Sequence, residues 1–129
     1  MEVNPVFEVG VRIQFGAAHR LEAHQGRCSR LHGHTWEVEA VFRGEGAGQS
    51  GMLLDFREAS SALEAAVADL DHTCLNDLEH FALKPPTAEN VARLVFERLT
   101  GAADAGEWDV APARVTVWES RDKWASYTP

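Results

Sequence analysis

Residues 7–19 read FEVGVRIQFGAAH, with apolar side chains at every second position from Phe7 to Phe15. A period of two is typical of a β-strand with one buried face. If the alternation continues, Ala17 and then His19 lie on the same side as the apolar residues. The segment therefore predicts a strand that ends with a histidine facing the core.

A second alternation occupies residues 34–43, HTWEVEAVFR, whose apolar positions are Trp36, Val38, Ala40 and Phe42. His32 and His34 have the parity of that apolar face. If the two strands form an antiparallel hairpin, the end of the first lies beside the start of the second. The pattern then places three imidazoles on one side of one sheet.

Helical spacing follows the two predicted strands. One helix is predicted from Arg57 onward in an alanine-rich stretch. Another is predicted to begin at the N-cap Thr87, with Glu89 favourable to the helix dipole in the first turn. The expected buried positions are Ala59, Leu63, Ala66, Val67 and Leu70 in the first helix, and Val91, Leu94, Val95 and Leu99 in the second.

The last third of the chain returns to strands. Residues 69–77, DLDHTCLND, are interpreted as a polar break, and residues 101–112 as a loop. Residues 113–120, ARVTVWES, alternate again, and residues 124–128, WASYT, are a candidate for a final strand. We expect one α+β domain over residues 1–129 with the order ββααββ, as two antiparallel hairpins with both helices on one face. So small a sheet leaves its edges unprotected, which favours pairing with other subunits.

Composition and charge limit the partners. The chain has 129 residues, of which 45% are hydrophobic and 25% charged, as in ordinary globular proteins. Its formal net charge of −8 lacks the basic excess that a nucleic-acid surface needs. No apolar run is long enough to span a bilayer, and no basic-then-apolar start suggests secretion. We expect a cytoplasmic protein with no nucleic-acid or membrane partner and with reduced thiols at Cys28 and Cys74.

The three converging histidines predict a metal site. Neutral imidazole suits zinc, and three histidines with an open fourth position are a catalytic ligand set. A lone H-x-H would more often be a pair of separate histidines, but the matching parity of a third favours the metal. His24 falls in the connecting loop and is left out of this ligand set, and His80 is expected at the surface.

Cys28 has two possible roles. As a fourth ligand it would close the coordination shell and make the site structural. As an uncoordinated thiol it could exchange protons, because the nearby cations Arg27 and Arg30 favour the thiolate. Cys74 is expected to be a buried, inert thiol.

Two further acidic positions are candidates for chemistry. Asp71 could orient His72 for proton transfer, although the pair is equally consistent with the polar end of a helix. Glu119 shares the parity of Val115 and Val117, so a carboxylate ends an apolar face, where it needs a partner. That partner could be a ligand edge with two N–H groups, such as a 2-amino-pyrimidinone, or a structural arginine. The strand could also turn Glu119 outward into solvent.

In order along the chain, FGAAHRL, CSRLHGH, LDHTCLND, PPTAEN and WES resemble the motifs of the 6-pyruvoyltetrahydropterin synthases and the related 6-carboxytetrahydropterin synthases. The resemblance covers roughly residues 7–127. It implies the tunnelling fold (T-fold), in which trimers close barrels from their short sheets and two trimers stack into a homohexamer. It also implies zinc ligands at His19, His32 and His34.

The same resemblance implies roles for the remaining candidates. Cys28 matches the catalytic thiol, with His72 and Asp71 as its relay partners. Glu119 matches the glutamate that anchors the pterin ring and takes part in the relay, and Thr87 falls in the segment that lines the ring. Triphosphate contacts are less defined; the candidates are Arg20, Arg27, Arg30 and Lys123.

The spacing C-x-x-x-H-G-H from Cys28 to His34 resembles the bacterial 6-carboxytetrahydropterin synthase of queuosine precursor synthesis. The implied reaction converts 7,8-dihydroneopterin triphosphate to 6-carboxy-5,6,7,8-tetrahydropterin, with release of acetaldehyde and triphosphate. The alternative within the family is a 6-pyruvoyltetrahydropterin synthase or a related lyase acting on the pterin side chain. The alternative of another class is a zinc module without catalysis, in which Cys28 completes a closed shell.

Overall fold

The structure of the chain is a computed structural model that describes residues 5–21, 30–46, 48 and 50–129. Five strands form one open sheet in the order β3-β1-β2-β4-β5. The strands are β1 (Phe7–His19), β2 (His32–Gly44), β3 (Thr73–Cys74), β4 (Ala111–Ser120) and β5 (Lys123–Tyr127). The two α-helices are α1 (Phe56–Val67) and α2 (Ala88–Ala105), and two 3-10 turns lie between them at Leu75–Asp77 and Glu79–Phe81.

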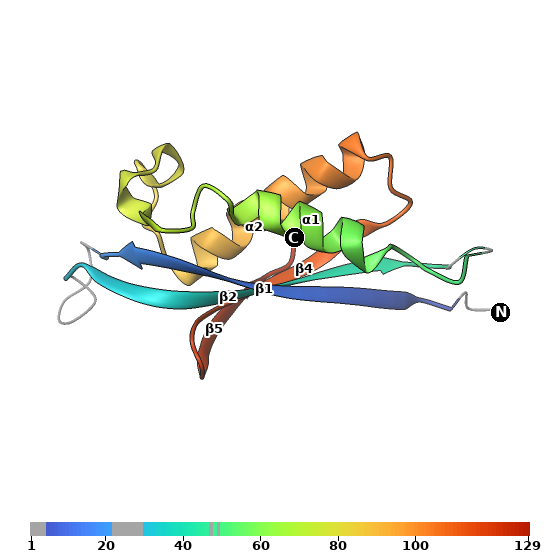
Figure 1. Cartoon of the computed structure of the whole chain (residues 1–129), viewed down its shortest axis with the longest axis horizontal. Coiled ribbons are helices and arrows are strands. Elements are labelled where there is room, and N and C mark those ends of the chain that lie inside the picture. Colours follow the sequence, from blue (N-terminus) through green and yellow to red (C-terminus); the bar gives the residue numbers. More distant parts are fainter. Residues whose placement is uncertain (1–4, 22–29, 47, 49) are drawn as a thin grey trace.

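Both predicted hairpins are confirmed. β1 pairs antiparallel with β2, and β4 pairs antiparallel with β5. β4 also pairs antiparallel with β2, which joins the hairpins into one sheet. Figure 1 shows α1 and α2 on the same side of this sheet, as the sequence predicts.

The sheet contains one strand that the sequence pattern does not predict. Thr73 and Cys74 form β3, which pairs in parallel with Ala17 and Ala18 of β1. A two-residue strand is too short to show a period of two, so the predicted order ββααββ lacks it.

The prediction of a loop over residues 101–112 is also wrong at both ends, because α2 continues to Ala105 and β4 begins at Ala111. The alanine-rich run after Gly101 has high helix propensity, which explains the longer helix.

The helices begin at residues that satisfy their first N–H groups. The Asp55 carboxylate accepts a hydrogen bond from Arg57 N at 2.8 Å and caps α1. The Thr87 hydroxyl accepts one from Asn90 N at 3.2 Å, which confirms Thr87 as the N-cap of α2. Thr87 therefore fixes the chain direction just after Pro86, a residue that contacts the site described below.

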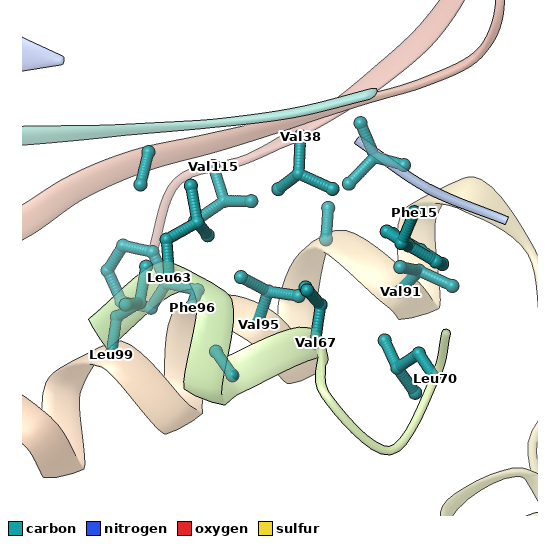
Figure 2. Packing of buried hydrophobic residues seen from close by; sticks show 14 of the residues in the cluster. Phe15, Val38, Leu63, Val67, Leu70, Val91, Val95, Phe96, Leu99 and Val115 are labelled. Carbon is teal, nitrogen blue, oxygen red and sulfur yellow. The ribbon is translucent and has the colours of Figure 1, made fainter. Parts of the chain in front are cut away.

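The hydrophobic core lies between the sheet and the helices. Figure 2 shows Val38 and Val115 of the sheet facing Leu63 of α1 and Val95 of α2. All four side chains are fully buried. The predicted buried positions agree with this packing except at Leu94, which is only partly buried. Leu70 is buried as expected but lies beyond the end of α1, which the sequence predicts to include it.

The opposite face of the sheet carries a charged cluster around Arg12. Arg12 pairs with Glu39 at 2.6 Å and with Glu37 at 3.7 Å, and its guanidinium stacks on Trp118. The predicted metal ligands lie on the core-facing side, so the sheet separates them from this charged surface.

Among the described residues, no helix is both long and apolar enough to cross a membrane.

Candidate functional site

The three histidines predicted as ligands lie together at the end of the β1–β2 hairpin. In the register of the hairpin, His19 stands opposite His32, and Ala17 stands opposite His34. The ring centroids are 4.6 Å apart for His19 and His32, 4.7 Å for His32 and His34, and 5.3 Å for His19 and His34. The parity of two strands thus places three imidazoles around one point.

Backbone carbonyls fix the orientation of two of these rings. His19 Nδ1 donates a hydrogen bond to Pro86 O at 2.7 Å, and His32 Nδ1 donates one to Arg30 O at 2.6 Å. Because a carbonyl oxygen only accepts, both Nδ1 atoms carry a proton. In the neutral rings, each Nε2 atom is then left with a lone pair for a ligand.

The fourth member of the group is Glu119, near the end of β4. One carboxylate oxygen, Oε1, lies 2.8 Å from His19 Nε2 and 3.1 Å from His34 Nε2. Four residues each offer one possible ligand atom, and these four atoms lie within 4.8 Å of one another: His19, His32, His34 and Glu119. These four residues, which we call the histidine–glutamate cluster, could hold a metal ion.

Burial makes this arrangement costly unless something binds it. His19 is only 1% exposed. Its Nε2 atom and that of His34 are buried without a hydrogen-bond partner among the described residues. Buried polar atoms are rarely left in this state, and imidazole nitrogens with a carboxylate oxygen are a donor set that suits a divalent cation such as zinc. The residues present therefore fit a metal.

His34 is held in the form that binds metals. Burial is the main cause that lowers its pKa, and the nearby imidazoles of His32 and His19, which would repel a second positive charge if protonated, act in the same direction. Glu119 opposes this shift but does not reverse it. The His34 ring is therefore neutral at pH 7.

Trp36 supports the histidine–glutamate cluster from within the core. Its indole N–H donates to Ala17 O at 3.2 Å, and its ring meets His19 and His34 edge-on at centroid distances of 5.0 and 5.8 Å. The side chain is fully buried. The sequence identifies Trp36 only as a core residue, because its indole hydrogen bond leaves no trace in a period of two.

Asp71 and His72 form the predicted carboxylate–imidazole pair. Asp71 Oδ1 lies 2.9 Å from His72 Nδ1 and also accepts a hydrogen bond from Gly16 N at 2.9 Å. This backbone hydrogen bond, followed by that from His72, lowers the pKa of the Asp71 carboxyl group. α1 ends at Val67, so the pair lies beyond the helix rather than in its last turn.

The His72 imidazole is open to solvent. Its side chain is 87% exposed, and the residue has a positive φ of 59°. Its backbone N–H donates to Gly16 O at 2.6 Å, which anchors this conformation on β1. His72 lines a shallow, open depression with Gly16, Gly33, His34 and Cys74. The depression gives the imidazole access to a ligand or to another chain.

Asn76 holds the chain immediately after His19. Its amide oxygen accepts from Arg20 N at 2.9 Å, and its amide nitrogen donates to Arg20 O at 2.9 Å. Together with β3 and Asp71, this contact holds the end of β1 from Gly16 to Arg20. Sequence reasoning missed Asn76, since an asparagine in a polar break is typical of any turn.

The remaining candidates have different outcomes. The predicted thiol Cys28 lies outside the described residues, as do His24 and Arg27. Thr87 is next to Pro86, the partner of His19, and its hydroxyl caps α2. Cys74 is only half-buried, contrary to the prediction, because it lies on the edge strand β3.

Comparison with known proteins identifies the family. The sequence profile of the family described as 6-pyruvoyl tetrahydropterin synthase matches residues 8–129. The chain belongs to this family. The 6-carboxy-5,6,7,8-tetrahydropterin synthase of Bacillus subtilis is 33% identical to this chain, over 95% of this chain and 86% of the relative. The dihydroneopterin monophosphate aldolase of Pyrococcus furiosus is 32% identical over 86% of this chain and 88% of the relative.

A solved structure confirms the predicted fold. The 6-pyruvoyl tetrahydropterin synthase of Caenorhabditis elegans superimposes with a TM-score of 0.85 at 27% identity, covering 100% of this chain and 99% of that one. The chain therefore has the T-fold of the 6-pyruvoyl tetrahydropterin synthase family. Its members act in pterin metabolism, which supports an enzyme with a small pterin as substrate.

Proposed function

We propose that the protein is a zinc-dependent lyase that converts 7,8-dihydroneopterin triphosphate to 6-carboxy-5,6,7,8-tetrahydropterin, with release of acetaldehyde and triphosphate. Such a product would serve the synthesis of queuosine and other 7-deazapurines. The observation that carries the proposal is the histidine–glutamate cluster, in which three imidazoles and one carboxylate converge. The similarity to the Bacillus subtilis enzyme supports the choice of product.

His19, His32 and His34 would hold the zinc ion. Zinc supplies Lewis acidity, which makes positions next to the oxygens of a substrate side chain more acidic. The chain contributes rigidity: Pro86 O and Arg30 O orient two of the imidazoles before the metal binds. Preset orientation is valuable in a rearrangement of several steps, because each step needs the same alignment.

Proton transfer would be the task of Cys28, His72 and Asp71. Asp71 holds the His72 imidazole through Nδ1, which leaves Nε2 to exchange a proton. Because His72 lies in an open depression, we propose that it serves a site completed by another subunit of a homo-oligomer, two stacked trimers in the arrangement of the family. Glu119 would pair with the N–H groups of the pterin ring, and Thr87 would line the ring.

Two other activities and one non-catalytic function are the alternatives. The similarity to the Pyrococcus furiosus aldolase favours, as second candidate, a related lyase that cleaves the pterin side chain elsewhere, and a 6-pyruvoyltetrahydropterin synthase belongs to the same group. A zinc module without catalysis would need Cys28 as a closing ligand. Glu119 Oε1 lies against two of the imidazoles, which supports Glu119 rather than Cys28 as the fourth group beside the histidines.

One assay separates these functions. Zinc-loaded protein is incubated with 7,8-dihydroneopterin triphosphate, the pterin product is identified by mass, and acetaldehyde is measured. A carboxypterin with acetaldehyde supports the proposal, a pyruvoyl product supports the synthase of that name, and a shortened pterin without acetaldehyde supports an aldolase. In Cys28→Ala, zinc content should persist while turnover is lost; equal loss of zinc would favour the closed module.

A further inference from the structure

We propose that Glu119 has two successive partners: without pterin, its carboxylate is the fourth ligand of the metal held by the three histidines, and pterin binding draws it away from the metal. The second half of this statement rests on the proposed function. The first half rests on the geometry of the cluster alone.

The distances place Glu119 at the vertex of a coordination shell. In a tetrahedral zinc site with bonds of about 2.0 Å, neighbouring ligand atoms are about 3.3 Å apart. Glu119 Oε1 is 2.8 Å from His19 Nε2 and 3.1 Å from His34 Nε2. A movement of a few tenths of an ångström would therefore bring these two separations to the length of a tetrahedral edge. The ligand atom of His32 lies within 4.8 Å of the other three.

The two contacts lack the geometry of hydrogen bonds. The Nε2 atoms of His19 and His34 lack a hydrogen-bond partner among the described residues, although Oε1 is close to both. The His19 proton is on Nδ1, where it is donated to Pro86 O. In a neutral ring, Nε2 and Oε1 would then present lone pairs to each other, an arrangement that a cation between them makes favourable.

No basic side chain competes for Glu119 in the described part of the chain. Its ion-pair contacts there are to His19 and His34. An arginine partner, one of the structural explanations of a glutamate at this strand end, is thus not found among the described residues. The Glu119 side chain is 28% exposed, so a ligand entering from solvent can reach the carboxylate.

The two roles of Glu119 exclude each other at Oε1. A 2-amino-pyrimidinone edge pairs with both oxygens of a carboxylate in one plane. Oε1 now lies against two imidazole nitrogens, in the space that such a ring edge would need. Pterin binding therefore requires the carboxylate to turn away, which would open one metal position for the oxygens of the substrate side chain.

Zinc affinity tests the first half. Zinc binding is measured by competition with a chelator for the wild type, Glu119→Gln and Glu119→Ala, and cobalt-substituted proteins are compared by visible absorption. We expect both variants to lose at least tenfold in zinc affinity and to show an altered cobalt spectrum. Unchanged affinity and spectrum in both variants would overturn the proposal.

Glu37→Gln is the matched control. Glu37 is a half-exposed glutamate on β2, paired in register with Trp118, the neighbour of Glu119, but it faces Arg12 on the polar side of the sheet. This variant should bind zinc as the wild type does. Thermal unfolding of all metal-free variants shows that they are folded; an equal loss of zinc affinity in the control would refute a specific role of Glu119.

Unsubstituted pterin, which has the ring but no side-chain oxygens, tests the second half. Its binding to metal-free and zinc-loaded protein is followed by its own fluorescence. We expect tighter binding to the metal-free protein, and weaker zinc binding by the same factor when pterin is present, since coupling is reciprocal. Pterin binding that leaves zinc affinity unchanged would refute displacement. Absence of pterin binding in both forms would instead overturn the proposed function, and displacement with it.

Discussion

Asn76→Ala should weaken metal binding without touching any ligand. The asparagine amide makes two hydrogen bonds of 2.9 Å to the backbone of Arg20, the residue after His19. Each hydrogen bond contributes about 0.5–1.5 kcal/mol, and a half-buried position is at the low end of this range. Their joint loss should cost about 1 kcal/mol, most of it in the order of the β1 end.

That cost appears in zinc binding because zinc requires the ordered strand end. If the metal must restore the order that Asn76 supplied, 1 kcal/mol corresponds to about a fivefold loss of affinity. Chelator competition measures the affinity, and denaturant unfolding of the metal-free protein measures the stability. Zinc stoichiometry should stay the same, because every ligand is retained.

Ser126→Ala is the control of similar size. It removes the 2.6 Å hydrogen bond between Ser126 and Thr116 of β4, whose side chain points away from the core-facing side of Val115 and Val117. The loss of stability should resemble that of Asn76→Ala, with zinc affinity unchanged. If both variants bind zinc like the wild type, or if both lose affinity equally, the reasoning about the strand end is refuted.

Three further outcomes follow from contacts elsewhere. Trp36→Phe keeps an aromatic ring under the histidines but removes the indole hydrogen bond to Ala17 O, so we expect a loss of about 1–2 kcal/mol in unfolding free energy. Leu63→Ala should cost about 2–4 kcal/mol in the same measurement while zinc stoichiometry persists, because the side chain is fully buried away from the ligands. Arg98 hydrogen-bonds the half-exposed Asp69 and lowers the pKa of its carboxyl group. The pair of Asp69 and Arg98 therefore adds at most about 1 kcal/mol to the free energy of unfolding above pH 4. This contribution is lost as the pH falls through the lowered pKa of Asp69 in the folded protein. Unfolding curves of the wild type and Asp69→Asn should differ at pH 7 and converge near pH 2; a difference independent of pH would contradict the assignment.

The hairpin could be predicted from the sequence because strand parity and burial are directly linked. His19 ends an apolar alternation and His32 begins another, so their meeting needs only a turn between them. β3 and Asn76 could not be predicted, since their positions depend on a parallel contact between segments more than fifty residues apart. Local patterns carry no information about such pairings.

Glu119 shows the same limit inside the site. Its parity with Val115 and Val117 correctly places the carboxylate on the core-facing side. Its contact with the histidines also requires β4 to lie beside β2, with Val117 opposite Val38. Strand order is a property of the whole sheet, so the sequence suggested a ligand for Glu119 but not its two imidazole neighbours.

The groups of the site differ in what holds them. The His19 and His32 rings are fixed by hydrogen bonds to backbone carbonyls, and Trp36 packs against His19 and His34 from the core. Among the described residues, the Glu119 carboxylate has ion-pair contacts to imidazole nitrogens alone. Rearranging a histidine would break a hydrogen bond or core packing, whereas turning the carboxylate breaks neither. Any exchange of ligands at this site should therefore begin with Glu119.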